Sequence, residues 1–374
     1  MSSSFQKIDT QDIVIGVPLP WNIYDSQGRL LLCKNYIINS KSQINRLLER
    51  GLFREQFVEE KYELPVRNEP LTPFDQMAYF QYRLNTIHTE IQSKTYTNLQ
   101  AQINKFAQDI QSLCDNDPDA ALGALHLDHD GKYSIIHPIH SALLSEIIAK
   151  RLHIETNQRH SILCAALTCN IGMIKLQDSL HKQESLLTEI QKSQLKLHPL
   201  LAVELLTEAG ISDEIWYNTV LHHHEKIDGS GYPAGIKGEA ISLPVRIVSL
   251  ADTYAAMVTP RAYRSEFQAK EALREIFLSR GKEVDEDLAH VFIKELGIYP
   301  PGVFVRLNNG EIAVVTRRSQ NTTCPTVQSI ISPRGGPYSK PKLRQCNTDE
   351  FAISAIVPKE KNLLINMRLL WGYE

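Results

Sequence analysis

Three consecutive histidines are the side chains of this sequence best suited to chemistry. Residues 222–224 are all histidine and stand directly before Glu225. Imidazole is the commonest side-chain donor to transition metals near neutral pH. A glycine-rich segment follows, which permits backbone angles closed to other residues, and we expect it to end a helix and turn Tyr232 and Pro233 outward. By side-chain type alone, the run is either a metal site or a solvated polar patch.

The segments around this run predict a largely helical body. Apolar residues recur at three- and four-residue steps from about residue 116 to 299, the spacing of one helix face. A tract at about 74–114 has the same spacing and is either a connecting helix, a dimer-forming helix or part of the core. At 303–315 the pattern changes to two short strands joined by Asn309-Gly310, a pair typical of a hairpin turn.

The N-terminal stretch alternates short apolar segments with turn signals, which indicates a small β-rich module. Two prolines between residues 68 and 73 suit a linker. The sequence therefore predicts a mainly α fold in four parts: a β-rich module at 1–67, a linker and connecting helix at 68–115, a helical domain at 116–302 and a C-terminal β extension at 303–374.

The composition excludes several classes of protein. The 43 acidic and 40 basic residues give a formal net charge of -3, so no basic excess is present to hold a nucleic-acid polymer. No apolar run approaches the ~18–20 residues of a membrane helix, and we expect a cytoplasmic protein without a membrane segment. The six cysteines form no CxxC pair, which indicates reduced thiols rather than a disulfide framework or a zinc ribbon.

The histidine run continues into a longer pattern. Residues 223–233 resemble the HHExxDGxGYP signature of HD-GYP domains and match it at every fixed position. Further pieces of the family pattern occur in the family's order: His140-Ser141, His198-Pro199, Ala251-Asp252 and the segment from Arg261 to Arg264. The resemblance covers about residues 133–307 and implies an HD-type helical bundle as the core.

The resemblance also implies an activity, a cofactor and a site. HD-GYP domains are metal-dependent phosphodiesterases that open cyclic di-GMP to pGpG or GMP. By position, one transition metal (iron, manganese or zinc) would bind at His198, His223 and His224. A neighbouring metal would bind at His140 and Asp252, and the nucleotide would be contacted by Arg261, Tyr263 and Arg264.

The Gly-Tyr-Pro loop is the family's docking site for diguanylate-cyclase (GGDEF) domains. The resemblance therefore implies such a partner for the loop that contains Asp228, Gly229, Gly231, Tyr232 and Pro233. The sequence leaves open whether the chain dimerises.

Several positions depart from the family pattern. The His-Asp pair that names the family is replaced by Cys169 and Asn170, and its lysine by Met173. Ala255 stands where the family has a second aspartate, and Ile136 stands one helical turn before His140, where some members carry an acidic ligand. Cys169 is either a thiolate ligand or an inert buried thiol. These losses remove negative charge that would bind cations, so they predict impaired catalysis.

Three hypotheses follow for the function. The first is a catalytically impaired module that binds cyclic di-GMP or a GGDEF partner. The second is an active or slow phosphodiesterase that uses one metal at the three histidines, a geometry that leaves a coordination position open. The third is a metal-free structural scaffold. Metal content and binding of cyclic di-GMP distinguish the three.

Overall fold

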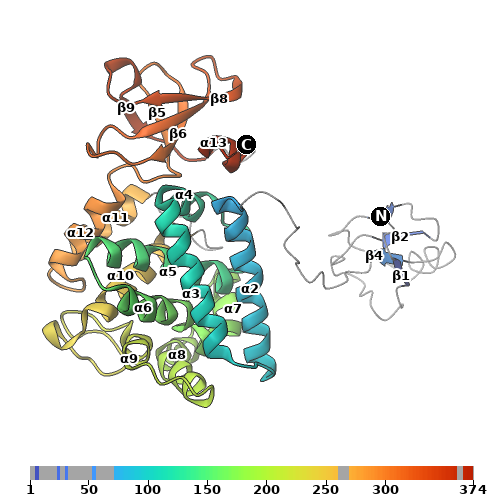
Figure 1. Cartoon of the computed structure of the whole chain (residues 1–374), viewed down its shortest axis with the longest axis vertical. Coiled ribbons are helices and arrows are strands. Elements are labelled where there is room, and N and C mark those ends of the chain that lie inside the picture. The colour runs from blue at the N-terminus through green and yellow to red at the C-terminus, as the bar shows by residue number, and fades with distance from the viewer. Residues whose placement is uncertain are drawn as a thin grey trace. The chain divides into compact units, whose positions relative to one another are not determined.

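The computed structural model describes residues 71–259, 269–359 and 365–373, together with four short strands near the N-terminus (Figure 1). The chain divides into two compact units, Met1–Glu69 and Pro70–Glu374. In the first unit the strands form an antiparallel sheet in the order β1-β4-β2-β3, with bounds Phe5–Lys7 (β1), Ile23–Tyr24 (β2), Leu30–Leu32 (β3) and Phe53–Glu55 (β4). Arg261, Tyr263 and Arg264, which were predicted to bind a ligand, lie outside the described residues.

The second unit is a helical body followed by a sheet (Figure 1). Its helices are α2 (Pro73–Ser93), α3 (Leu99–Asn116), α4 (Pro118–Leu127), α5 (Tyr133–Arg151), α6 (Thr156–Thr168), the 3₁₀ turn η2 (Ile171–Met173), α7 (Ile174–Lys182), α8 (Glu189–Glu208), α9 (Glu214–His222), η3 (Gly238–Ala240), α10 (Leu243–Val258), α11 (Ala269–Ser279) and α12 (Glu286–Leu296).

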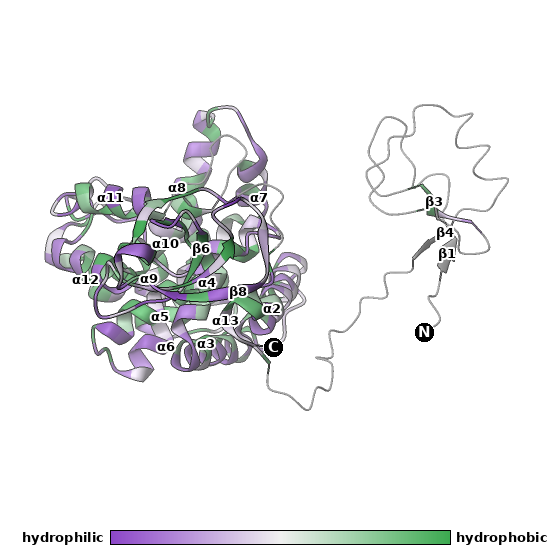
Figure 2. Cartoon of the chain, turned by 90° about the horizontal axis from the view of Figure 1, so that it is seen from above, coloured by the Kyte–Doolittle hydropathy of each residue, from purple (hydrophilic) through white to green (hydrophobic). Residues whose placement is uncertain are grey.

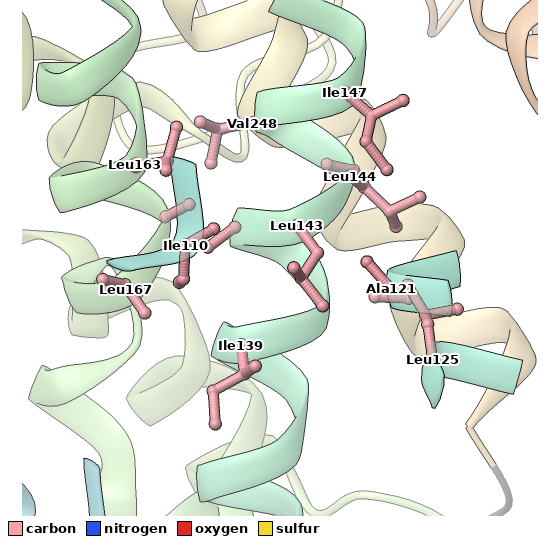
Figure 3. Packing of buried hydrophobic residues seen from close by; sticks show 14 of the residues in the cluster. Ile110, Ala121, Leu125, Ile139, Leu143, Leu144, Ile147, Leu163, Leu167 and Val248 are labelled. Atoms are coloured by element: carbon pink, nitrogen blue, oxygen red, sulfur yellow. The ribbon is translucent and has the colours of Figure 1, made fainter. Parts of the chain in front are cut away.

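Helix α5 lies at the centre of this body. All of its residues from Tyr133 to Ala149 are buried, and it packs against α6 and α10 as well as α3, α4 and α7. Figure 3 shows Leu143 and Leu144 of α5 among side chains of α3, α4, α6 and α10. A helix that is buried on every side lies in the interior of a protein, so the core forms around α5.

The helical tract predicted at 74–114 is two helices. Lys94 follows the end of α2 and Asn98 precedes the start of α3, and both of these residues adopt left-handed backbone angles. The Asn98 side chain accepts a hydrogen bond from the backbone of Ala101, which caps α3. Both helices contribute buried residues to the same apolar core as α5.

The chain after α12 forms a five-stranded antiparallel sheet in the order β8-β7-β6-β5-β9. Strand β6 is largely buried, whereas the edge strand β8 is mostly exposed and hydrophilic, a contrast that the hydropathy colours of Figure 2 show. The bounds are Phe304–Leu307 (β5), Ile312–Arg317 (β6), Thr326–Ile331 (β7), Pro337–Gln345 (β8) and Ile353–Ile356 (β9), with the turn η4 (Asp349–Phe351) before β9 and the short helix α13 (Met367–Trp371) at the end.

The predicted fold class is thereby confirmed: a mainly α protein with an N-terminal β module and a C-terminal β extension. Among the described residues, no helix has the length and apolarity needed to cross a membrane.

Candidate metal centre

Three of the predicted metal ligands form one cluster. The ligand nitrogens of His198, His223 and His224 all lie within 4.8 Å of one another. His198 comes from the middle of α8, whereas the other two follow the end of α9. His198 and His223 are fully buried and His224 is partly exposed, so any ligand reaches the cluster from the side of His224.

The backbone fixes which nitrogen of each ring is available. Pro199 has no N–H to donate to the carbonyl of Leu195, four residues earlier, and His198 Nδ1 donates to that oxygen instead, at 2.5 Å. At the end of α9, His223 Nδ1 donates to the carbonyl of Val220 at 2.8 Å. Both rings therefore present an Nε2 lone pair to the cluster, and these two atoms lie 3.2 Å apart.

Burial keeps the three imidazoles neutral. It lowers the pKa of His198 to about 3 and also lowers the pKa of His223 and His224. Neutral imidazole is the form that coordinates a metal. Facing lone pairs in a buried, uncharged cluster fit a transition metal cation, because the cation turns their repulsion into coordination.

A glycine lets the two parts of the site approach. Gly172 lies in η2, and a Cβ atom built there would be 2.4 Å from the carbonyl oxygen of His198 and 2.8 Å from the backbone nitrogen of Ala202. Only a residue without a side chain allows this contact between η2 and α8. Gly172 therefore places Asn170 and Met173 beside the histidine cluster.

The loop after α9 turns back over the cluster. Buried Glu225 accepts hydrogen bonds from the backbone of Ala234 at 2.7 Å and of Gly235 at 3.1 Å. The ring of Tyr232 stacks on His224 with centroids 4.8 Å apart. The expectation that Tyr232 turns outward was therefore wrong, because its ring stacks on His224 of the three-histidine cluster, while Pro233 is exposed.

The remaining loop residues shape the turn. Asp228 accepts a hydrogen bond from the backbone of Ser230 at 2.9 Å, and Gly229 adopts a φ of +83°. A Cβ atom on Gly231 would lie 2.5 Å from the carbonyl oxygen of His224, so this glycine permits the close return of the chain.

Asp252 lies near the cluster but is held by hydrogen bonds. His137 Nε2 donates to its Oδ1 at 2.7 Å, and Asn170 Nδ2 donates to the same oxygen at 3.4 Å. Burial alone would raise the pKa of Asp252, but His137 and the neighbouring imidazoles outweigh it and hold that pKa well below the usual range. The carboxylate is therefore charged and already bonded to two N–H donors.

His140, which was predicted to share a metal with Asp252, lies elsewhere. Its buried ring faces His129, with centroids 6.1 Å apart, and His137 of the same helix takes the place beside Asp252. The sequence analysis missed His137, three residues before His140. Both positions lie on similar sides of α5, so spacing alone could not separate them.

Three of the positions that depart from the family pattern, Cys169, Ala255 and Ile136, have ordinary packing roles. Cys169 is fully buried, and burial raises the pKa of its thiol well above the usual value, which keeps it protonated. Its Sγ donates to the carbonyl of Ala166 at 3.5 Å. Ala255 and Ile136 lie in the apolar interior. Among the described residues, neither Cys169 nor Asp252 joins a group of three ligand atoms.

A pocket of about 400 Å³ opens beside the cluster. Its polar lining includes side chains of His137, Asn170, His224, Tyr232 and Asp252. Most of its apolar lining comes from η2, α7, α8 and α10. This volume lies in the range of small-molecule sites.

Comparisons with known proteins agree with this geometry. Residues 124–288 match a family model described as an HD domain. The chain is 29% identical over 218 residues to the cyclic di-GMP phosphodiesterase PA4108 of Pseudomonas aeruginosa, which covers 58% of this chain and 52% of that protein. It is 26% identical over 178 residues to the 3'3'-cGAMP-specific phosphodiesterase 3 of Vibrio cholerae, covering 46% of this chain and 38% of that protein.

A solved structure has the same fold. Bd1817, an HDG"Y"P protein of Bdellovibrio bacteriovorus, superposes with a TM-score of 0.53 at 14% identity, covering 77% of this chain and 98% of that one. The chain spans about half the length of PA4108. Residues 124–288 therefore match the HD domain family, and this part of the chain is similar to cyclic di-GMP phosphodiesterases.

Proposed function

We propose that this chain is a cyclic di-GMP signalling module that binds the nucleotide in the pocket beside a single metal and hydrolyses it weakly. The hydrogen bonding of Asp252 supports the weak hydrolysis. His137 and Asn170 point N–H groups at its carboxylate, in the place where a second cation would need acceptor atoms. The amide of Asn170 supplies no negative charge in either orientation.

The metal would be held by His198, His223 and His224. When bound there, iron, manganese or zinc would polarise a phosphate oxygen and lower the pKa of a water. The chain's own residues supply the rest of the site. Tyr232 covers His224, and the charged Asp252 orients the imidazole of His137 in the lining of the pocket.

A calorimetric titration of the purified full chain with cyclic di-GMP, after loading with manganese or ferrous iron, tests this proposal. We expect saturable binding, with turnover at least ~100-fold below the roughly 1 s⁻¹ at the low end of ordinary enzymes. Absence of binding would overturn the nucleotide function. Turnover near ordinary enzyme rates would overturn the impairment.

The second candidate is a genuine phosphodiesterase, active or slow, whose role is the hydrolysis itself and not the binding of the nucleotide. The partly exposed His224 lines the pocket, so a metal at the cluster would have one side open to a substrate. This candidate requires product to accumulate on long incubation and to disappear in His224→Ala. Persistence of the same slow turnover in His224→Ala would rule it out.

We also propose that the exposed side of the Gly-Tyr-Pro loop docks a GGDEF domain. Pro233, Ala234 and Gly235 are exposed, and Glu225 fixes their backbone. Pull-down of a GGDEF domain by the wild-type chain, and its loss in Pro233→Asp, is the expected result. Equal recovery by both chains would contradict it.

A further inference from the structure

One side of a short helix forms a wall of the pocket. Side chains three and four residues apart share a helix face, and four residues of this spacing in η2 and α7 line the pocket: Met173, Gln177, Leu180 and His181. Further apolar side chains in the lining are Leu187, Leu195, Ala256 and Met257.

Gln177 is the amide side chain in this wall. Its side chain is 6% exposed, and its Oε1 atom is buried with no hydrogen-bond partner among the described residues. A buried polar atom without a partner destabilises the folded protein. A ligand in the pocket that hydrogen-bonds to the amide, after a small rotation of the side chain, recovers this energy.

Three stacked rings also line the pocket. Tyr133 stacks between His137, at 4.9 Å and 13°, and His181, at 4.7 Å and 14°. All three rings line the cavity. Apolar side chains, flat rings and the Gln177 amide in one lining suit a planar ligand that has apolar faces and a polar edge.

A purine base has this shape. Resting on the function proposed above, we propose that the α7 wall of the pocket forms a purine subsite and that Gln177 is the residue that reads the base. A carboxamide offers one acceptor oxygen and two N–H donors. By rotating through 180° it can pair with the N1–H and O6 of guanine or with the N6–H and N1 of adenine.

The amide can present either its acceptor oxygen or its N–H donors to the same base atom, and this predicts the nucleotide specificity. The chain would accept both guanine and adenine at this subsite, and hence both cyclic di-GMP and 3'3'-cGAMP. A carboxylate at the same position would only accept hydrogen bonds. It would therefore favour guanine, whose N1–H and N2–H both donate, over adenine, whose N1 is an acceptor.

Calorimetric affinities of the metal-loaded full chain for cyclic di-GMP and 3'3'-cGAMP test the assignment. We expect the wild-type affinities to agree within about tenfold. Gln177→Glu should raise the preference for cyclic di-GMP over 3'3'-cGAMP by about tenfold. Gln177→Leu should lower the affinity for both nucleotides by about tenfold, the equivalent of one net hydrogen bond. Gln194→Glu, an exposed position of α8, makes the same charge change away from the pocket and should leave the ratio unchanged.

The outcomes separate this assignment from the function on which it rests. If the wild type binds neither nucleotide, both fail. If binding persists but Gln177→Glu leaves the ratio as it was, or the wild type already prefers one nucleotide by 100-fold, the purine subsite at Gln177 is wrong and the proposed function stands. Thermal melting of each variant verifies that it folds.

Discussion

The Nε2 atoms of His198 and His223 lie 3.2 Å apart, while the Nδ1 atom of each ring donates to a backbone carbonyl oxygen. Neither ring has a proton left to place between them when both are neutral. Two lone pairs therefore face each other in a buried site, with His224 as a third donor. A bound cation relieves this repulsion, so the affinity for metal should depend on the groups that orient the two rings.

Pro199→Ala tests how the ring of His198 is oriented. Alanine restores an N–H that competes with His198 Nδ1 for the carbonyl oxygen of Leu195. We expect metal affinity to fall by about 10- to 100-fold, as for loss of other groups that orient a ligand. The metal-free protein should become more stable, by roughly 1 kcal/mol or more, because the helix gains a hydrogen bond.

Competition with a chromophoric chelator measures that affinity. Pro138→Ala in α5 is the matched control, because it removes another proline from a helix without touching the three-histidine cluster. Unaltered metal affinity in Pro199→Ala would show that the tautomer of His198 does not depend on the proline.

Gly172→Ala should separate η2 from α8. The added methyl group would meet the backbone of His198 and Ala202 at less than 3 Å, and backbone atoms cannot rotate away. We expect a loss of about 1–3 kcal/mol in the free energy of unfolding, typical of overpacking. Urea denaturation measures it, with Gly336→Ala as control, since the nearest atom there is 3.8 Å away. Equal stability of the two variants would contradict the packing role of Gly172.

The stability of the metal-free protein should fall between pH 7 and pH 5. Burial lowers the pKa of His88, His126 and His129 to about 4 and that of His198 to about 3. Below pH 6.5 the unfolded chain binds protons at these histidines that the folded chain does not, so acid favours unfolding. Each histidine contributes up to ~2 kcal/mol over this window. Asp252 does not offset this, because the stability that its lowered pKa provides is lost only below about pH 4.

Urea unfolding at pH 7, 6 and 5 checks this dependence. His126→Asn should reduce the slope of the unfolding free energy against pH by about one proton, whereas substitution of His290, which is exposed, should leave it unaltered. A free energy of unfolding that is flat over this range would contradict the assignment of neutral, buried histidines.

Asn170→Asp should create a binding site for a second cation. The new carboxylate would lie close to that of Asp252, where the Asn170 amide now donates at 3.4 Å, and two buried carboxylates repel unless a cation lies between them. We expect a second equivalent of manganese or iron and at least a ~10-fold faster hydrolysis of cyclic di-GMP. Asn218→Asp makes the same change where the side chain bonds to Ser242. Identical metal content and turnover in the two variants would contradict this role of Asn170.

Much of the site could be predicted because its residues belong to the family pattern. His223 and His224 adjoin the glycine turn of the signature, and His198 was assigned by its place in the same pattern. The choice between His137 and His140 could not be made in this way. It depends on how α10 crosses α5, since His137 meets Asp252 across that contact and His140 does not. Packing angles of this kind are absent from sequence periodicity.

The pocket was beyond prediction for a related reason. Gln177 and His181 reach it only because α7 folds back beside α5 after the turn at Gly172. Tyr232 was expected to point outward, because glycine-rich turns are usually exposed. Its stacking on His224 depends on the hydrogen bonds that Glu225 makes to the loop.

The metal content of the purified chain tests the central claim most directly. After saturation with manganese or ferrous iron and removal of excess metal, elemental analysis should find one equivalent in the wild type, essentially none in His224→Ala, and one in His222→Ala, whose ring lies 3.6 Å from Glu225 and outside the cluster. Two or more equivalents in the wild type, or equal metal content in His224→Ala and His222→Ala, would contradict a single site at His198, His223 and His224.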